Sequence, residues 1–172
     1  MSLDLAIAYV KGQDIAPYID CLDRFCDKSG AKMWIYDEPS VATHGEAGLC
    51  HVRLGGGNTP LLAGEAKVLV ALEELEGRRA LRYLAKDGIL VLCCFHRLPL
   101  SVATGTVGYP SDTLDILANR PLFCVQPKEF SPLLVCALTL RAMGVLESDV
   151  RGILANDSSD AIGRAFGKSL GV

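Results

Sequence analysis

The sequence predicts an α/β fold, a three-layer sandwich with a mostly parallel sheet, and three observations support this prediction. Apolar strand-like runs alternate with helix-like patterns along the 172 residues. The run 66–72 is apolar apart from Lys67, as is typical of a strand buried on both faces of a parallel sheet. A helical pattern over 73–85 joins this run to an apolar strand at 89–95, which makes a βαβ unit. We expect one domain covering residues 1–172.

The first half of the chain predicts one helix between extended segments. The helix runs from about 14 to 29, because apolar residues recur there at helical spacing, and Gly30 ends it. The polar stretch 37–46 is predicted to be a surface loop, and the glycines at 55–57 suit a tight hairpin. The extended segments are 3–9, 31–36, 47–54 and, after the hairpin, 59–62.

The second half predicts further strands and helices after the βαβ unit. Ser131 followed by Pro132 suits the start of a helix, which runs to Met143 and stops at Gly144. The remaining elements are an extended stretch at 100–104, a loop at 104–110, short helices at 112–119 and 148–154, a strand at 122–126 and a polar tail at 156–172.

Composition and charge exclude several function classes. A net charge of −3 and scattered basic residues argue against nucleic-acid binding. The longest apolar runs, 89–95 and 133–140, are well short of the roughly 20 residues that a membrane-spanning helix needs. The first residues do not resemble a signal peptide, so we expect a cytoplasmic protein. The seven cysteines are odd in number and form no C-x-x-C, which predicts reduced, mostly buried thiols rather than a disulfide framework or an iron–sulfur site.

The turn after the first strand is the most informative local feature. A dinucleotide-binding fold carries G-x-G-x-x-G at this place, but only Gly12 remains in the turn 10–13. Asp14, at the start of the helix, would accept the N–H groups that a phosphate needs and would repel its charge. The phosphate site is therefore expected to be closed, although Lys11, Gly12 and Gln13 stay candidates for binding another anion.

A second candidate ligand site follows the strand at 89–95, because open α/β sheets bind ligands at the carboxyl ends of their strands. His96, Arg97 and Thr104 are the candidates there, with a solvated or partner-facing edge as the alternative. His51 and Arg53 share one face of a strand and are interpreted as a polar strand end. The three glutamates at 73, 74 and 76 are interpreted as the acid-rich first turn of a helix. No catalytic residue and no metal site is expected.

Five strings, in order, resemble the gamma subunit of 2-oxoacid:acceptor oxidoreductases, the family of pyruvate:ferredoxin and indolepyruvate:ferredoxin oxidoreductases. Residues 50–55, C-H-V-R-L-G, are similar to the family's S-H-V-R-x-G, and 59–61, T-P-L, to its S-P-L. Residues 65–73, E-A-K-V-L-V-A-L-E, resemble its E-A-D-V-L-L-A-L-E. The strings at 84–88 and 163–166 resemble its L-K-x-G-G strand entry and its N-x-x-A-F. The resemblance implies the fold of the gamma subunit, or domain III, of pyruvate:ferredoxin oxidoreductase.

The sequence departs from this family at two places. The family's first turn resembles G-x-G-G-Q-G, where this chain has Tyr9, Lys11 and Asp14 at three of the glycine positions. The loop 37–46 keeps little of the family's E-V-H-G-M-x-Q-R-G-G beyond Gly45. The scaffold is therefore retained, whereas the two loops expected to face a ligand or a partner differ.

In this family the gamma unit carries neither thiamine diphosphate nor the iron–sulfur clusters, which belong to partner subunits. The resemblance implies that this chain binds no cofactor itself, is inactive alone and docks against the catalytic subunits. Asp37, Glu38 and His44, in the altered loop, are the candidate docking residues. A homodimer is left open. The alternative function is a stand-alone α/β domain that binds a small ligand at the strand ends.

Overall fold

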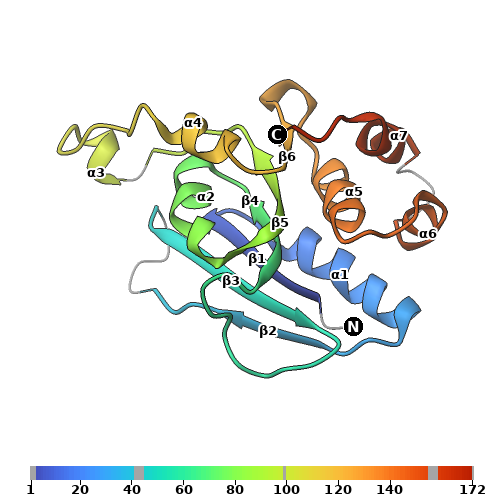
Figure 1. Ribbon diagram of the computed structural model, residues 1–172. Helices are drawn as coiled ribbons and strands as arrows, with labels where there is room; N and C mark the ends of the chain where they lie inside the picture. Colours follow the sequence, from blue (N-terminus) through green and yellow to red (C-terminus); the bar gives the residue numbers. More distant parts are fainter. Residues whose placement is uncertain (1–2, 41–44, 99, 155–158, 172) are drawn as a thin grey trace.

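The computed structural model describes residues 3–40, 45–98, 100–154 and 159–171, and its centre is a six-stranded sheet in the order β2-β3-β1-β4-β5-β6 (Figure 1). β1, β4, β5 and β6 pair in parallel, while β3 pairs antiparallel with both β1 and β2. Since two reversals cancel, β2 runs in the direction of β1, and β3 alone of the six runs the other way. The strands are β1 (Leu3–Val10), β2 (Met33–Asp37), β3 (Ala47–Leu54), β4 (Ala66–Ala71), β5 (Leu84–Cys93) and β6 (Leu122–Val125).

Helices cover both faces of this sheet, so the predicted three-layer α/β fold is confirmed. α1 (Ala16–Ser29), α5 (Pro132–Ala142), α6 (Glu147–Ile153) and α7 (Ser159–Gly167) contribute to the core on one face. α2 (Glu74–Ala80) and α4 (Thr113–Ala118) contribute to the smaller core on the other face. The remaining helix, α3 (Leu100–Ala103), lies on an excursion away from the sheet (Figure 1).

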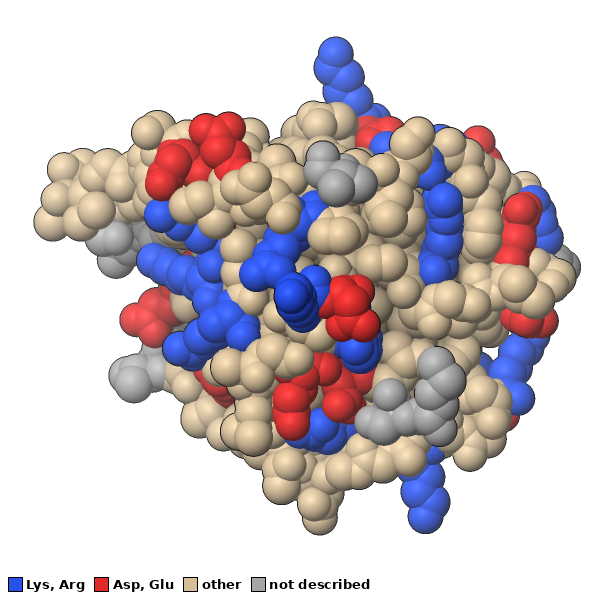
Figure 2. Space-filling model, in the orientation of Figure 1, with Lys and Arg blue, Asp and Glu red and all other residues tan. Residues whose placement is uncertain are grey.

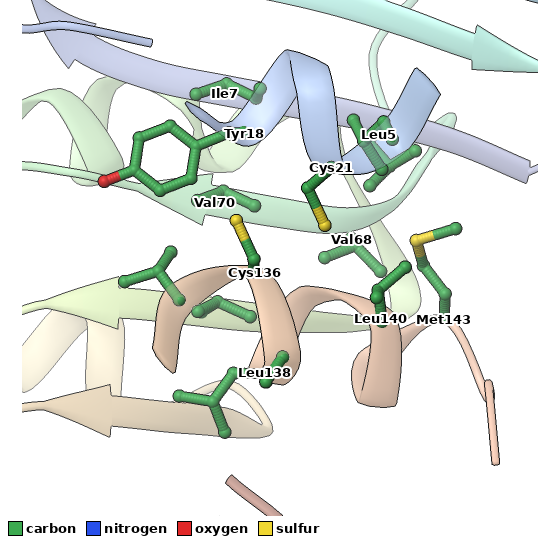
Figure 3. Close-up of a cluster of buried hydrophobic side chains, with 14 of the residues drawn as sticks. Leu5, Ile7, Tyr18, Cys21, Val68, Val70, Cys136, Leu138, Leu140 and Met143 are labelled. Carbon is green, nitrogen blue, oxygen red and sulfur yellow. The ribbon is translucent and has the colours of Figure 1, made fainter. Parts of the chain in front are cut away.

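Alternation of side chains along the strands divides the apolar residues between the two cores. Leu5 and Ile7 of β1, with Val68 and Val70 of β4, face α1 and α5, where Cys21 lies beside Cys136 (Figure 3). The intervening residues of the same strands, such as Leu69, face α2. Burial on both faces explains why the central strands are so uniformly apolar.

Several predicted boundaries hold. The strand at 47–54 is observed at the predicted residues, and the Ser131 side chain caps α5 by accepting a hydrogen bond from the backbone N–H of Leu134 at 3.1 Å. The predicted first helix begins slightly later, at Ala16. Among the described residues, no helix is long and apolar enough to cross a membrane.

Three segment predictions are wrong, and in each case tertiary contacts decide. The helix at 73–85 ends at Ala80 and a 3₁₀ turn, because the chain from Leu84 onward pairs with β4. The piece 59–62 forms no strand, since side chains of β3 bind its backbone instead. Residues 100–103 form a helix rather than an extended stretch.

The predicted polar tail contains a further helix, α7, which the sequence reading missed. Its apolar residues Ala161, Ile162 and Ala165 are buried at helical spacing against the core. The surrounding Ser, Asp and Gly residues hide this short stripe in the sequence. The C-terminal segment then returns to the sheet, where Gly171 pairs with Leu122 of β6.

The cysteine prediction is correct for five residues and wrong for two. Cys21, Cys26, Cys50, Cys93 and Cys136 are free and buried. Cys94 and Cys124 instead form a disulfide between the ends of β5 and β6. Spacing in the sequence could not reveal this pair, because the two residues become neighbours only when the parallel strands align.

Candidate functional site

The candidate site lies at the edge of the sheet where β1, β4, β5 and β6 all end, because parallel strands place their carboxyl ends together. The segments that follow these strands are 11–13, 72–74, 94–96 and 126. They include four of the six predicted ligand-binding residues, Lys11, Gly12, Gln13 and His96, and they divide into two separate groups.

The first group centres on the Lys11 ammonium, whose hydrogen-bond donors all have acceptors within the chain. Lys11 Nζ donates to the hydroxyl oxygen of Tyr9 at 2.8 Å, to Asp37 Oδ2 at 2.8 Å and to the Glu38 carbonyl at 3.1 Å. An ammonium has three donors, and all three have acceptors here. Burial works against the charge, but the hydrogen bonds to Asp37 and Tyr9 outweigh it and raise the pKa of Lys11. An anion could bind Lys11 only by displacing one of these acceptors.

Gln13 and Gly12 shape the turn after β1. The Gln13 side chain accepts a hydrogen bond from the backbone N–H of Val10 at 2.7 Å and donates to the Leu72 carbonyl at 3.2 Å. It thereby ties the end of β1 to the end of β4. Gly12 has a φ of 97°, which residues other than glycine rarely adopt. Asp14 Oδ1 accepts from the backbone N–H of Ala16 at 2.9 Å, so it occupies a donor at the start of α1 as predicted, but the N-cap residue of the helix is Ile15 and not Asp14.

The predicted docking residues adjoin this group. Asp37 also accepts a hydrogen bond from the Tyr9 hydroxyl at 2.7 Å, and Glu38 Oε1 lies 3.1 Å from His51 Nε2. Both carboxylates are partly exposed, with 44% and 42% of their side chains accessible. His44 lies outside the described residues. Docking by these residues stays a prediction.

His51 and Arg53 are buried and clasp the loop that follows β3. His51 Nδ1 accepts the backbone N–H of Leu61 at 3.2 Å, so the ring proton lies on Nε2 and is donated to Glu38. The Arg53 guanidinium donates to Asp4, Glu65 and the carbonyls of Thr59 and Pro60. The string H-V-R, with T-P-L after it, therefore encodes a structural clasp rather than a catalytic pair.

The second group surrounds α2, whose first turn carries three glutamates. They stand at the helix start as predicted, but Glu73, Glu74 and Glu76 are all buried, at most 3% exposed. Glu73 caps the helix by accepting from the backbone N–H of Glu76 at 2.9 Å, and it accepts from the Tyr109 hydroxyl at 2.9 Å. Glu76 pairs with Arg79 at 2.6 Å. Burial raises the pKa of Glu76, Arg79 opposes this, and Glu73 adds to it.

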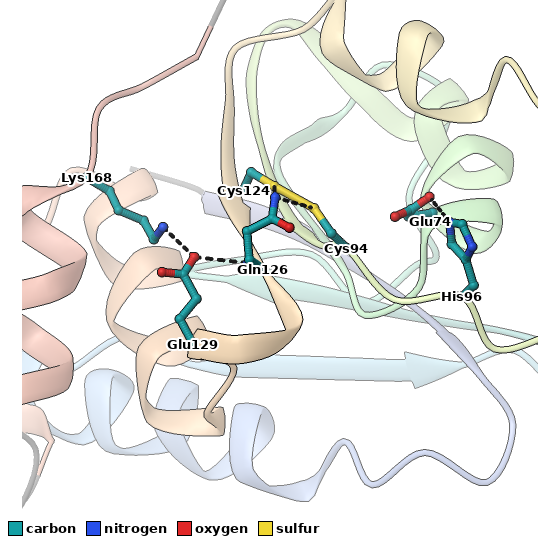
Figure 4. Close-up of a disulfide and its surroundings, with 7 residues drawn as sticks. All are labelled: Glu74, Cys94, His96, Cys124, Gln126, Glu129 and Lys168. Carbon is teal, nitrogen blue, oxygen red and sulfur yellow. Dashed lines mark hydrogen bonds and ion pairs between the residues drawn. A yellow bond between two sulfur atoms is a disulfide. The ribbon is translucent and has the colours of Figure 1, made fainter.

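His96 belongs to this second group. Its Nε2 lies 2.6 Å from Glu74 Oε2 (Figure 4), and its ring packs against Tyr109 with 4.7 Å between the centroids. His96 and Glu74 line a pocket of about 600 Å³ at the ends of β5 and β6. Its other lining residues are mainly apolar, together with both disulfide cysteines: Leu92, Cys94, Phe95, Leu114, Ala118, Leu122, Cys124, Gln126 and Pro127.

Arg97 and Thr104 do not line this pocket. Arg97 is exposed just beyond His96, and the Thr104 hydroxyl lies 3.0 Å from that of Thr106 in an exposed loop. The candidates Lys11 and Gly12 are also outside it. The structure therefore divides the predicted strand-end ligand site into two regions, and ligand binding at either one stays a prediction.

A further pocket of about 330 Å³ lies between β3 and α2 and was not predicted. Glu38, Glu76, Arg79, Arg82 and Tyr83 provide its polar lining. Figure 2 shows Lys and Arg side chains gathered in the region of α2, beside Asp and Glu. The one feature of the sequence that could have indicated this pocket is the group of arginines at 78, 79 and 82, which follows the glutamates at the start of the helix.

No family model matches the sequence. A curated relative, indolepyruvate oxidoreductase subunit IorB of Archaeoglobus fulgidus, is 30% identical over 111 residues, which are 64% of this chain and 55% of that protein. The chain thus spans about half the length of the curated relative that it matches.

Solved structures match over nearly the whole chain. Pyruvate oxidoreductase subunit PORC of Thermotoga maritima matches with a TM-score of 0.58 at 15% identity, over 96% of this chain and 93% of that chain. A keto/oxoacid ferredoxin oxidoreductase gamma subunit of Geobacter sulfurreducens matches with a TM-score of 0.53 at 14% identity, with the same coverage.

A third structure matches part of a longer chain. The 2-oxoglutarate:ferredoxin oxidoreductase of Magnetococcus marinus, solved with 2-oxoglutarate, coenzyme A and succinyl-CoA bound, matches with a TM-score of 0.55 at 13% identity. The match covers 96% of this chain and 30% of that one. At these identities the three structures show a shared fold. Together with the curated relative, they confirm the resemblance that the five sequence strings indicate.

Proposed function

We propose that this chain, similar to gamma subunits of 2-oxoacid:ferredoxin oxidoreductases, is a non-catalytic gamma-type component of such an enzyme. The observation that carries the proposal is the 30% identity to an indolepyruvate oxidoreductase subunit over 64% of the chain. The common fold with a pyruvate oxidoreductase subunit and a gamma subunit supports it. In this role the chain docks against catalytic subunits, which hold thiamine diphosphate and the iron–sulfur clusters, and it does not turn over substrate alone.

The geometry of the first turn supports a docking role over cofactor binding. Lys11 has its three protons bound by Tyr9, Asp37 and Glu38, and Gln13 bonds to backbone groups at the ends of β1 and β4. The polar groups of Lys11 and Gln13 are therefore already hydrogen-bonded within the chain. The partly exposed carboxylates of Asp37 and Glu38 are left at the surface, where a basic partner patch could meet them.

The first test is affinity purification of the tagged chain from its source organism, followed by identification of the co-purifying proteins. We expect thiamine- and cluster-binding subunits, with thiamine-dependent 2-oxoacid oxidation in the eluate. Recovery of the chain alone, with no such activity, would contradict the proposal.

A pair of neutral substitutions tests which surface docks. Charge reversal at Asp37 and Glu38 would disturb Lys11 and His51, so we choose Asp37→Asn and Glu38→Gln, which retain acceptor oxygens. The double variant should weaken association about tenfold, as expected for the loss of roughly 1.4 kcal/mol of charge attraction. Asp87→Asn is the matched control, because Asp87 is an exposed carboxylate within β5, away from the strand ends. Equal binding by all three proteins would exclude Asp37 and Glu38 as contacts.

The alternative function, a stand-alone binder of a small ligand, is favoured by one observation. The pocket of about 600 Å³ has the size of a small-molecule site, and the Glu74–His96 pair gives its apolar wall one polar end. A ligand that stabilises the chain in the absence of any catalytic subunit, and loses this effect in His96→Ala, would favour this alternative.

A further inference from the structure

Cys94 and Cys124 differ from the other cysteines in exposure. The five free cysteines are buried, and burial raises the pKa of Cys50 and of Cys93 to about 12. Such thiols stay protonated and unreactive at neutral pH. Cys94 and Cys124, by contrast, are partly exposed and line the pocket of about 600 Å³ at the strand ends. A small thiol that enters this pocket therefore meets this pair and not the buried thiols.

The sheet holds the pair together. β5 and β6 align Leu92 with Cys124, and the backbone N–H of Cys94 donates to the Val125 carbonyl at 2.9 Å. The Cα atoms of Cys94 and Cys124 are 6.7 Å apart, within the range over which disulfides form. Because the parallel ladder fixes both backbones, the thiols stay neighbours when the bond between them is broken.

Gln126 directs an amide donor at the two sulfur atoms (Figure 4). Its Nε2 lies 3.1 Å from Cys124 Sγ and 3.6 Å from Cys94 Sγ. The amide is oriented by a reciprocal cap, in which the Gln126 side chain accepts from the backbone of Glu129 and the Gln126 N–H donates to Glu129 Oε1. Lys168 holds the same Glu129 carboxylate at 2.6 Å. The shorter contact shows that the donor favours negative charge on Cys124 over Cys94.

We propose that Cys94 and Cys124 form a thiol–disulfide exchange site for low-molecular-weight thiols and their disulfides. In the reductive direction the thiolate RS⁻ attacks Cys94 Sγ, the Cys94–Cys124 bond breaks, and the electron pair passes to Cys124 Sγ. Cys124 accepts the Gln126 hydrogen bond and then a proton. A second RS⁻ attacks the R sulfur of the mixed disulfide, which releases Cys94 as a thiol and forms RSSR. Two RSH thus supply two electrons and two protons, and RSSR reverses the sequence.

Alkylation of the native full-length chain tests the proposal. The chain is equilibrated in buffers of reduced and oxidised glutathione, treated with N-ethylmaleimide, and mapped by peptide mass spectrometry. We expect labelling of Cys94 and Cys124 that rises together as the proportion of reduced glutathione increases, while the other five label only in denaturant. A pair labelled at every ratio, or at none, would overturn the proposal, as would equal labelling of the buried cysteines.

Variants test the assigned direction of attack. Gln126→Ala should slow reduction by dithiothreitol about tenfold, the effect of losing one hydrogen bond of roughly 1.4 kcal/mol to the leaving thiolate. Asn119→Ala, the matched control, removes another exposed side-chain amide, which donates to the Asp115 carbonyl and contacts neither sulfur, and should leave the rate unchanged. Acid quenching of the wild-type chain during reduction by glutathione should trap the mixed disulfide at Cys94 rather than at Cys124. An unchanged rate in Gln126→Ala, or a mixed disulfide trapped at Cys124, would refute the assignment. The inference is independent of the proposed docking role, because the isolated chain suffices for every measurement.

Discussion

Replacing Arg53 by Met should lower the free energy of unfolding more than replacing any exposed charged residue by a neutral one. Met retains an apolar stem of similar length but removes the guanidinium from the clasp between β3 and the loop 55–65. Four contacts are lost: to Asp4 Oδ2 at 2.8 Å, Glu65 Oε2 at 2.6 Å, the Thr59 carbonyl at 2.7 Å and the Pro60 carbonyl at 3.2 Å.

The magnitude follows from the burial of these partners. Removing one member of a buried ion pair costs about 3–5 kcal/mol, and each hydrogen bond to a charged group contributes about 1.5–3 kcal/mol. These values do not add, and the Glu65 side chain, 36% exposed, can turn towards water. The lower end, about 3 kcal/mol, is therefore expected, which for a chain of this size lowers the Tm by about 6–12 °C.

Thermal and urea unfolding measure this effect. Arg53→Lys should lie between the wild type and Arg53→Met, since one ammonium cannot bind two carboxylates and two carbonyls. Lys67→Met is the control, because the Lys67–Asp87 pair is half or more exposed on both sides and should not change the Tm measurably. An Arg53→Met protein that melts within about 2 °C of the wild type, equivalent to less than about 1 kcal/mol, would refute the clasp as a source of stability.

Three further predictions concern glycine packing, pH and the closed turn. Gly48→Ala should cost about 1–3 kcal/mol in urea unfolding, because the added Cβ would lie 2.6–2.8 Å from the Tyr9 ring. Gly163→Ala is the control, because beyond its own stretch of helix backbone the added Cβ would meet no atom of the described residues within 4 Å; it should stabilise helix α7 by about 0.5–1 kcal/mol. Glu76→Gln should raise the Tm at pH 7.5 and leave it unchanged at pH 4. Because burial raises the pKa of Glu76 in the folded state above its ordinary value of 4.5, ionisation opposes folding as the pH rises. A lower Tm for Glu76→Gln at pH 7.5 would contradict this sign. Asp14→Gly alone should give no binding of phosphate or coenzyme A by calorimetry, since Lys11 stays held by Asp37; micromolar binding would show that Asp14 alone closes the turn.

The strand and helix order was predictable because it depends on local patterns. Periodic apolar runs identified the β3, β4 and α5 segments, and the Ser131–Pro132 cap fixed where α5 starts. Pairing decided what local patterns could not. Leu84 enters β5 because Ala66 is opposite it, and residues 59–62 stay out of the sheet because Arg53 and His51 take their backbone groups.

The sequence was enough to select candidate residues such as His96, but it did not show which side chains they contact. His96 was selected for its place after a strand, and the structure adds Glu74, which the sequence presents as an ordinary helix start. The same limit applies to the disulfide: Cys94 and Cys124 are 30 residues apart and carry no spacing signal. Contacts between separate strand ends arise only from the register of the sheet.

The two segments that depart from the family pattern, the first turn and the loop 37–46, contact each other in the folded chain. The sequence places Tyr9 at the end of the first strand, Lys11 in the turn after it and Asp37 at the start of the altered loop, with no sign that they interact. In the structure Lys11 bonds to both others, and the Tyr9 hydroxyl donates to Asp37 at 2.7 Å. Gly48 opposite Tyr9 leaves the space that the aromatic ring requires. Lys11 stands where the family has a glycine, and its ammonium would be an unpaired positive charge at this strand end. Asp37, from the altered loop, neutralises that charge. Opening the turn to an anion therefore requires changes on both segments, because Asp37 holds the cation that the anion would need.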